Sequence, residues 1–337
     1  MIPTWITRIA MSVATILFAA TVVAQPMTVR FGSVGGATDA GVYIADELGY
    51  FKDAGLTIDM QRMSNAPSLT AAIATNQLDV AGISITPGLY TAIQQSLNLR
   101  IVGDKQSIRP GFSATRVVVK PELVKATEAE TIKGLKGKKF AISSKAAAVY
   151  MLLHALLAKH GMTLADLQVV ELAYPNMLAA MASGAVDAAM NLEPFLSQTV
   201  QAGVGKVVHD LIELIPDRNA SIVPLVYSEN FAKSPAAQRF MTAYMKGVRV
   251  YNDAFGANRD KERIIDVIAR RGKIDPKVIR EGFTAGLDPN QGVNIAALEA
   301  FQKFFVAQNM IRTPVDVTRI VDTSFAKAAI QALGPYQ

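Results

Sequence analysis

The chain has 337 residues, half of them hydrophobic, and it contains no cysteine. This length exceeds what one ordinary hydrophobic core supports, so we expect two domains or lobes. The lack of cysteine excludes a structural disulfide, a thiolate metal site and a lipid anchor on cysteine. The formal charge is +6, but only "KGLKGKK" (133–139) clusters basic residues. That pattern favours a solvated loop or docking surface over a surface that binds nucleic acid or a membrane.

The first 24 residues have the features of a secretory signal peptide. Arg8 precedes an apolar run from Ile9 to Val23, and Val22-Val23-Ala24 fits the small-residue rule for cleavage. A membrane anchor is the alternative, but the run of about 15 residues is shorter than the roughly 20 that span a bilayer. We therefore expect cleavage after Ala24, and export to the periplasm.

Strands and helices then alternate in two similar halves. The first half predicts strands at 28–33 and 56–62 around a helix at about 39–52, and the second predicts strands at 139–143 and 169–172 around a helix at about 146–160. Each half continues with a similar segment, "LTAAIATNQLDVAGISIT" (69–86) and "MLAAMASGAVDAAMNLEP" (177–194), at an offset of 108 residues. The alternation predicts parallel βαβ units, and hence two α/β lobes. Asp79 and Asp187 precede the last strand of each repeat, where we expect them to shape a turn.

Two extended runs are expected to join the lobes. Ala114–Lys120 leads into the second lobe and Ser221–Ser228 leads out of it, so both are candidate hinge segments. Four helices follow Glu229, at about 235–252, 261–271, 295–308 and 323–333, and are expected to cover the first lobe. The predicted division is therefore lobe 1 at 27–113 plus 229–337, and lobe 2 at 114–228.

Four stretches together resemble the substrate-binding proteins of ABC importers: "YIADELGYFKDAGLTIDM" (43–60), "LDVAGIS" (78–84), "LKGKKFAISS" (135–144) and "GAVDAAMNLEPF" (184–195). The similar group is the NMT1/THI5-like branch, which includes SsuA/TauA-like binding proteins for sulfonate, taurine and nitrate. The resemblance implies an α/β, type II periplasmic-binding-protein fold whose lobes close on a small ligand. The implied ligand is a sulfonate, an aromatic or other small organic anion, or a pyrimidine-like compound. The implied partner is an inner-membrane ABC permease with its ATPase.

Candidate ligand-binding residues follow the strands, because ligands of open α/β sheets lie beyond the carboxyl ends of the strands. Hydroxyl groups and helix N-termini in these loops suit an anion, although the same residue types are ordinary helix caps. Lys105, Arg109 and Arg116 lie near the approach to the second lobe, where each could neutralise an acidic ligand or be a solvated surface charge. The predicted ligand-binding set is Ser33, Gly36, Thr38, Ser84, Thr86, Ser144, Asn176, Asn191 and Glu193.

Other functions remain as alternatives. His154, His160 and His209 lack metal-ligand spacing, so we expect no metal and no cofactor. The resemblance extends to a pyrimidine synthase that uses a cysteine-rich iron motif and a consumed histidine, but this chain has no cysteine. A periplasmic sensing or signalling protein would need an attached module, which we do not expect because the first strand follows the leader directly. We expect a monomeric binding protein and not an enzyme.

Overall fold

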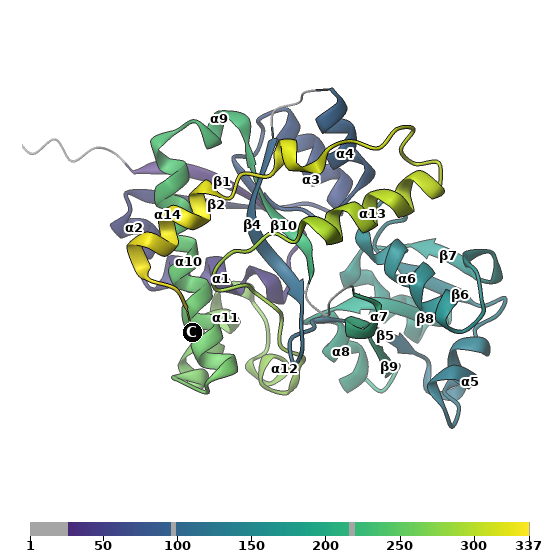
Figure 1. Ribbon diagram of the computed structural model, residues 1–337. Helices are drawn as coiled ribbons and strands as arrows, with labels where there is room; N and C mark the ends of the chain where they lie inside the picture. Colours follow the sequence, from purple (N-terminus) through teal and green to yellow (C-terminus); the bar gives the residue numbers. More distant parts are fainter. Residues whose placement is uncertain (1–25, 96–98, 216–219, 337) are drawn as a thin grey trace, which may run out of the picture.

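The computed structural model describes residues 26–95, 99–215 and 220–336. The expected signal peptide and its cleavage site lie outside these residues. Within them, every helix is too short or too polar to cross a membrane. The described chain forms two five-stranded sheets, each flanked by helices (Figure 1), which confirms the predicted α/β architecture of two lobes.

The two sheets have the same internal order. The first sheet runs β2 (Leu56–Arg62), β1 (Met27–Ser33), β3 (Val80–Gly82), β10 (Ala220–Ser228) and β4 (Leu99–Ile108). The second runs β7 (Gln168–Glu171), β6 (Lys139–Ile142), β8 (Ala188–Leu192), β5 (Thr115–Val119) and β9 (Lys206–Asp210). In each sheet the first three strands are parallel, and the fourth is antiparallel to both of its neighbours.

The sequence repeat corresponds to equivalent strands, β3 and β8, with equivalent turns before them. The Asp79 carboxylate accepts a hydrogen bond from the backbone N–H of Arg30 on β1 at 2.9 Å. The Asp187 carboxylate accepts one from the backbone N–H of Lys139 on β6, also at 2.9 Å. Each aspartate therefore joins its turn to the neighbouring strand, which confirms the structural role expected for both.

The crossing strands correct the predicted lobe boundary. Ser221–Ser228 was assigned to the end of lobe 2, but β10 pairs with β3 and β4 in the first sheet. Ala114–Lys120 was expected to be a hinge, but its centre is β5, which pairs with β8 and β9. Both runs are extended, as predicted, yet both are built into a sheet. The chain passes between the sheets at 109–114 and again between Asp210 and Ala220.

The helices largely follow the predicted ranges. The predicted helix at 39–52 is divided by Gly49, whose positive φ of 78° ends one helix before the next begins. The helices are α1 (Ala40–Glu47), α2 (Tyr50–Asp53), α3 (Ala66–Ala74), α4 (Pro87–Gln94), α5 (Glu128–Lys133), α6 (Ala148–Lys159), α7 (Tyr174–Ala182), α8 (Phe195–Gln201), α9 (Glu229–Ala232), α10 (Pro235–Gly256), α11 (Lys261–Gly272), α12 (Pro276–Glu281), α13 (Ile295–Ala307) and α14 (Ser324–Leu333).

The C-terminal helices cover more than the first lobe. α10 and α11 pack against α1 on the first lobe, and α14 packs against α10 and β4, as expected. α13 contacts both α4 of the first lobe and α6 of the second (Figure 1). The Phe304 ring of α13 lies 5.9 Å from the ring of Tyr150 and 5.3 Å from that of His154, both on α6. All four helices therefore cover the first lobe, as expected, but α13 covers part of the second lobe as well.

Candidate functional site

A polar cavity lies between the two sheets, where β1, β6 and β8 end. Ser33 ends β1, Ser143 follows β6 and Leu192 ends β8, so the cavity lies at the carboxyl ends of these parallel strands, as predicted. The residues that line it are Ser33, Val34, Thr38, Ser64, Asn65, Ala66, Gly82, Ser84, Lys105, Gln106, Thr115, Ser143, Val149, Tyr174, Leu192, Ile222 and Val223.

The lobes touch each other around this cavity. The backbone N–H of Ala148, at the start of α6, donates to Ser84 Oγ at 3.3 Å. The backbone N–H of Ala37 donates to the carbonyl oxygen of Glu193 at 3.0 Å. The space open to the centres of water molecules is about 40 Å³, which holds a few waters and no large ligand. In this conformation the lobes are closed on a small space.

Lys105 supplies the positive charge of the cavity. It lies in β4 and is 1% exposed, so the interpretation of Lys105 as a solvated surface charge is wrong. Its aliphatic stem crosses Gly82, where a Cβ atom would stand 2.5 Å from Lys105 Cγ. Its Nζ donates to Thr38 Oγ1 at 2.9 Å and lies 2.7 Å from Asp39 Oδ1. Glycine at position 82 therefore lets the lysine reach the cavity.

Asp39 compensates this charge from behind the cavity wall. Its carboxylate accepts hydrogen bonds from Ser33 Oγ at 2.7 and 2.9 Å and from Tyr43 OH at 3.5 Å. Burial, with the neighbouring Asp39 charge, raises the pKa of Tyr43 to about 12, so this hydroxyl remains a donor. Two of the three Lys105 donors are thus engaged with protein, and the pair as a whole is neutral.

Hydroxyl groups and helix N-termini make up much of the remaining polar wall. Asn65 caps α3 by accepting a hydrogen bond from the backbone N–H of Ser68. Tyr174 begins α7, and its hydroxyl lies 3.0 Å from Ser143 Oγ. Burial raises the pKa of Tyr174, which keeps the phenol protonated. Among the described lining residues none is acidic, so the cavity offers mostly donors and suits an acceptor-rich ligand.

The predicted ligand-binding residues divide into two groups. Ser33, Thr38 and Ser84 line the cavity. Thr86 accepts a hydrogen bond from the backbone N–H of Leu89 and so caps α4, while Ser144 Oγ accepts one from Ala146 within its own loop. Asn176 is exposed in the first turn of α7.

The other predicted residues are engaged near the contact between the lobes. Asn191 is fully buried, donates to Thr199 Oγ1 and accepts a bond from Leu192, so its amide is used inside the second lobe. Gly36, with a φ of 155°, lies against the Glu193 carbonyl. The Glu193 carboxylate accepts hydrogen bonds from Ser197 and from the backbone N–H of Phe283 at 2.9 Å. Burial raises the pKa of Glu193, although the hydrogen bonds from Ser197 and Phe283 act to lower it.

The two arginines near the crossing do not line the cavity. Arg109 donates to Asn252 and to the Leu287 carbonyl. Arg116 pairs with Asp210 at 2.6 Å and stacks on the ring of Phe283. Lys105 is therefore the one of the three candidate cations that reaches the cavity.

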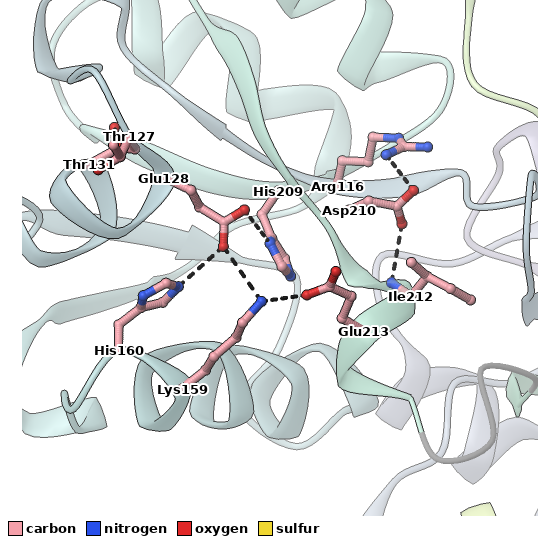
Figure 2. A network of polar contacts seen from close by, with 10 residues as sticks. All are labelled: Arg116, Thr127, Glu128, Thr131, Lys159, His160, His209, Asp210, Ile212 and Glu213. Atoms are coloured by element: carbon pink, nitrogen blue, oxygen red, sulfur yellow. Dashed lines mark hydrogen bonds and ion pairs between the residues drawn. The ribbon is translucent and has the colours of Figure 1, made fainter.

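Two histidines meet at a carboxylate away from the cavity (Figure 2). His160 Nε2 lies 3.2 Å from Glu128 Oε1, and His209 Nδ1 lies 3.0 Å from Oε2. Burial disfavours ionisation of Glu128, but the bonds from both histidines and the charge of Lys159 outweigh it, so the pKa of Glu128 is lowered. Within the part of the chain that the structure describes, no three histidine, cysteine, aspartate or glutamate side chains come together as a group that could hold a metal ion.

Several cavity residues were missed by sequence reasoning. Gln106 and Thr115 line the cavity, and Gln106 Nε2 donates to Thr115 Oγ1 at 3.1 Å across the two sheets. Both lie within strands, whereas the prediction considered the loops after strands. Asp39 entered the prediction only as the first residue of the helix expected at about 39–52. The local sequence contains no signal for this pair, because Lys105 is flanked by the polar residues Asp104 and Gln106.

Comparison with known proteins identifies one family whose sequence pattern matches most of the chain. The sequence profile described as "NMT1/THI5 like" matches residues 37–253. A protein of Brucella abortus, itself only provisionally named as a binding protein, is 26% identical over 272 residues, which cover 80% of this chain and 79% of that protein.

The solved structures share the fold at low sequence identity. The alkanesulfonate-binding protein SsuA from Xanthomonas axonopodis pv. citri, bound to MOPS, is 22% identical with a TM-score of 0.69, covering 89% of this chain and 99% of that one. The periplasmic nitrate-binding protein NrtA from Synechocystis PCC 6803 is 16% identical with a TM-score of 0.74, covering 91% and 89%. The desulfurization enzyme DSZB is 16% identical with a TM-score of 0.61, covering 91% and 99%.

Proposed function

Because the chain belongs to the NMT1/THI5-like family, we propose that it is the periplasmic solute-binding component of an ABC importer. It captures a small solute between its lobes and delivers it to an inner-membrane permease with an ATPase. The related binding proteins for alkanesulfonate and nitrate support this role. We infer that the protein acts as a monomer and that nucleic acid is not a partner.

The proposed ligand is a small organic oxyanion, such as a sulfonate or a carboxylate. The observation that carries this proposal is a cavity with Lys105 and several hydroxyl groups on its wall and no acidic residue among its described lining. The ammonium and hydroxyl groups donate hydrogen bonds, and charge-assisted bonds to an oxyanion are the stronger ones. Apolar lining from Val149, Leu192 and Ile222 suits the organic part of such a ligand.

Binding is proposed to stabilise the closed arrangement of the lobes. A solute bound to Lys105 and Thr38 of the first lobe gains contacts with Thr115 and Ser143 of the second only when the lobes are closed. A ligand favours the conformation that it binds more tightly. Saturating ligand should therefore reduce the radius of gyration measured by solution scattering, and an unchanged profile despite proven binding would contradict closure.

The ligand class can be tested by a thermal-shift screen of the purified protein. Alkanesulfonates, aromatic carboxylates and uncharged pyrimidines should be compared, because a bound ligand raises the unfolding temperature by mass action. Stabilisation by either anionic class, lost in Lys105→Met, would support the proposal. Stabilisation by pyrimidines alone would contradict the oxyanion, although not the binding function.

A matched pair of variants locates the site by calorimetric titration. Ser84 lines the cavity, whereas Asn191 is buried inside the second lobe. Ser84→Ala should weaken binding by about 1–3 kcal/mol, the cost of an unsatisfied buried partner. Asn191→Ala should lower the unfolding temperature and leave the affinity of the folded protein close to that of the wild type. The reverse pattern would place the ligand elsewhere.

Export and the absence of catalysis are also proposed. Intact mass of the periplasmic protein should correspond to a chain that begins at Gln25, and a major species that retains Arg8 would contradict this. The enzyme that shares the fold is the alternative. No histidine is among the described residues that line the cavity, and the sequence has no cysteine, so we propose solute binding without catalysis.

A further inference from the structure

A second polar pocket lies beside the ligand cavity, at the pair formed by β4 and β10. Its described lining consists of Asp104, Ser107, Ser221, Asp288, Gly292, Val293 and Asn294, and it shares none of these residues with the ligand cavity. Asp104 precedes the cavity residue Lys105 directly in β4. The space open to the centres of water molecules is about 160 Å³, so the pocket holds several waters or a hydrated ion.

Three buried oxygen atoms in this pocket have no hydrogen-bond partner. They are Asp104 Oδ1, Ser107 Oγ and Ser221 Oγ. The three residues are 0%, 3% and 8% exposed, respectively. Buried polar atoms are nearly always paired, because each unsatisfied one costs about 1–3 kcal/mol. Three in one pocket indicate that something other than the protein satisfies them.

The pocket also contains a second carboxylate. Asp104 Oδ2 accepts a hydrogen bond from the backbone N–H of Asp288 at 2.8 Å, which places the two residues side by side. The Asp288 carboxylate accepts hydrogen bonds from the backbone N–H groups of Asn290 at 2.8 Å and Gly292 at 2.9 Å. These bonds fix its orientation but supply no positive charge. No lysine, arginine or histidine is among the described residues of the lining.

Burial makes the negative charge of Asp104 costly. The two serine hydroxyls lie close enough to affect Asp104, but neither meets the geometry of a hydrogen bond in the structure. A buried carboxylate beside a second carboxylate is compensated most directly by a cation.

We propose that this pocket binds a hard divalent cation, for which Ca²⁺ is the best match, through Asp104 Oδ1, the Asp288 carboxylate and the hydroxyls of Ser107 and Ser221. All these donors are oxygen atoms, which calcium and magnesium prefer. A divalent ion neutralises two carboxylates. Calcium tolerates an irregular set of donors completed by water, whereas magnesium requires a nearly regular octahedron.

Binding of Ca²⁺ can be measured on the whole protein after treatment with EDTA and dialysis. Calorimetric titration should show saturable binding of one Ca²⁺ per chain, and the thermal unfolding midpoint should rise with Ca²⁺ concentration. Asp104→Asn should weaken binding by at least about tenfold, since it removes a direct ligand. The asparagine keeps the shape of the side chain and an oxygen for the Asp288 N–H, so the variant should fold. The control Asp59→Asn alters an exposed carboxylate of β2 and should bind Ca²⁺ like the wild type.

Three outcomes would overturn the proposal. The first is no saturable binding up to about 10 mM Ca²⁺, which is beyond the range of weak calcium sites in proteins. The second is equal binding by Asp104→Asn and the wild type. The third is an equal rise of the midpoint with NaCl at matched ionic strength, which would show screening only. If Asp104→Asn does not fold, Ser107→Ala with Ser221→Ala tests the same site, and undiminished Ca²⁺ binding by that double variant would count against it.

Discussion

Breaking the buried pair of Asp39 and Lys105 should destabilise the protein strongly. The two side chains are 0% and 2% exposed, and the atoms Lys105 Nζ and Asp39 Oδ1 lie 2.7 Å apart. Asp39→Asn keeps an acceptor for Ser33 but leaves the ammonium of Lys105 buried without its counter-charge. Removing one partner of a buried pair typically costs about 3–5 kcal/mol. We expect a loss in this range for Asp39→Asn and for Lys105→Met.

The double variant separates the charge interaction from other effects. Asp39→Asn with Lys105→Met removes both charges, so the remaining cost is the altered hydrogen bonding at Ser33 and Thr38, about 1 kcal/mol each. The loss in the double variant should therefore be smaller than the sum of the two single losses by at least about 2 kcal/mol, which is the coupling free energy.

Urea unfolding followed by far-ultraviolet circular dichroism is the suitable assay, because the single tryptophan, Trp5, lies in the expected leader. If the two lobes unfold in separate transitions, the substitutions should shift the midpoint of the first lobe's transition. The control is Glu262→Gln, which breaks an exposed pair with Arg280 and should not shift the midpoint. Losses that add in the double variant, or a loss below about 1 kcal/mol for Asp39→Asn, would refute a coupled buried pair.

Two further variants test particular contacts. Gly82→Ala should weaken ligand binding at least severalfold without removing any polar group. The new Cβ would stand 2.5 Å from Lys105 Cγ and would displace that side chain. Calorimetric titration measures the affinity, and an unchanged value would contradict this prediction. Glu128→Gln should cost about 1 kcal/mol at pH 7, the contribution of charge-assisted bonds from His160 and His209 at a partly exposed site. Because the pKa of Glu128 is lowered on folding, this stability is present above the unfolded pKa near 4.5 and is lost as the pH falls through the folded pKa. The free energy of unfolding from urea titrations should therefore fall more between pH 7 and a pH below 4 for the wild type than for Glu128→Gln. The other acidic residues contribute equally to both proteins, so the difference between them reports Glu128.

The sequence predicted the parts of the fold that have regular patterns. Alternation of strands and helices identified β1, β2, β6 and β7 within one or two residues, and the internal repeat placed β3 and β8. The loop rule found Ser33, Thr38 and Ser84, because all three follow strands whose carboxyl ends meet at one edge.

The burial of β4 and the Lys105–Asp39 pair could not be predicted from the sequence, because a buried segment does not always have an apolar pattern. β4 contains "GDKQS", a polar segment typical of a loop, yet almost the whole strand is buried. Lys105 pairs with a residue 66 positions away, so no local spacing indicates it. Asn191 lies near the end of β8 and Glu193 directly follows it, but side chains of α8 engage both of them. Side-chain direction and the partners within reach separate these two residues from those that line the cavity, and the local sequence specifies neither.

The contact of α13 with both lobes affects how easily the protein opens. The chain passes between the sheets twice, and a few backbone dihedrals absorb a rotation at low cost. Opening must also separate α6 from the ring of Phe304, and the loss of this apolar contact costs free energy in proportion to the area exposed. The ratio of open to closed molecules before any solute arrives is therefore set in part by a helix that touches neither the solute nor the connecting segments. A smaller side chain at position 304 would raise the fraction of open molecules, and the apparent affinity would fall with an unaltered cavity.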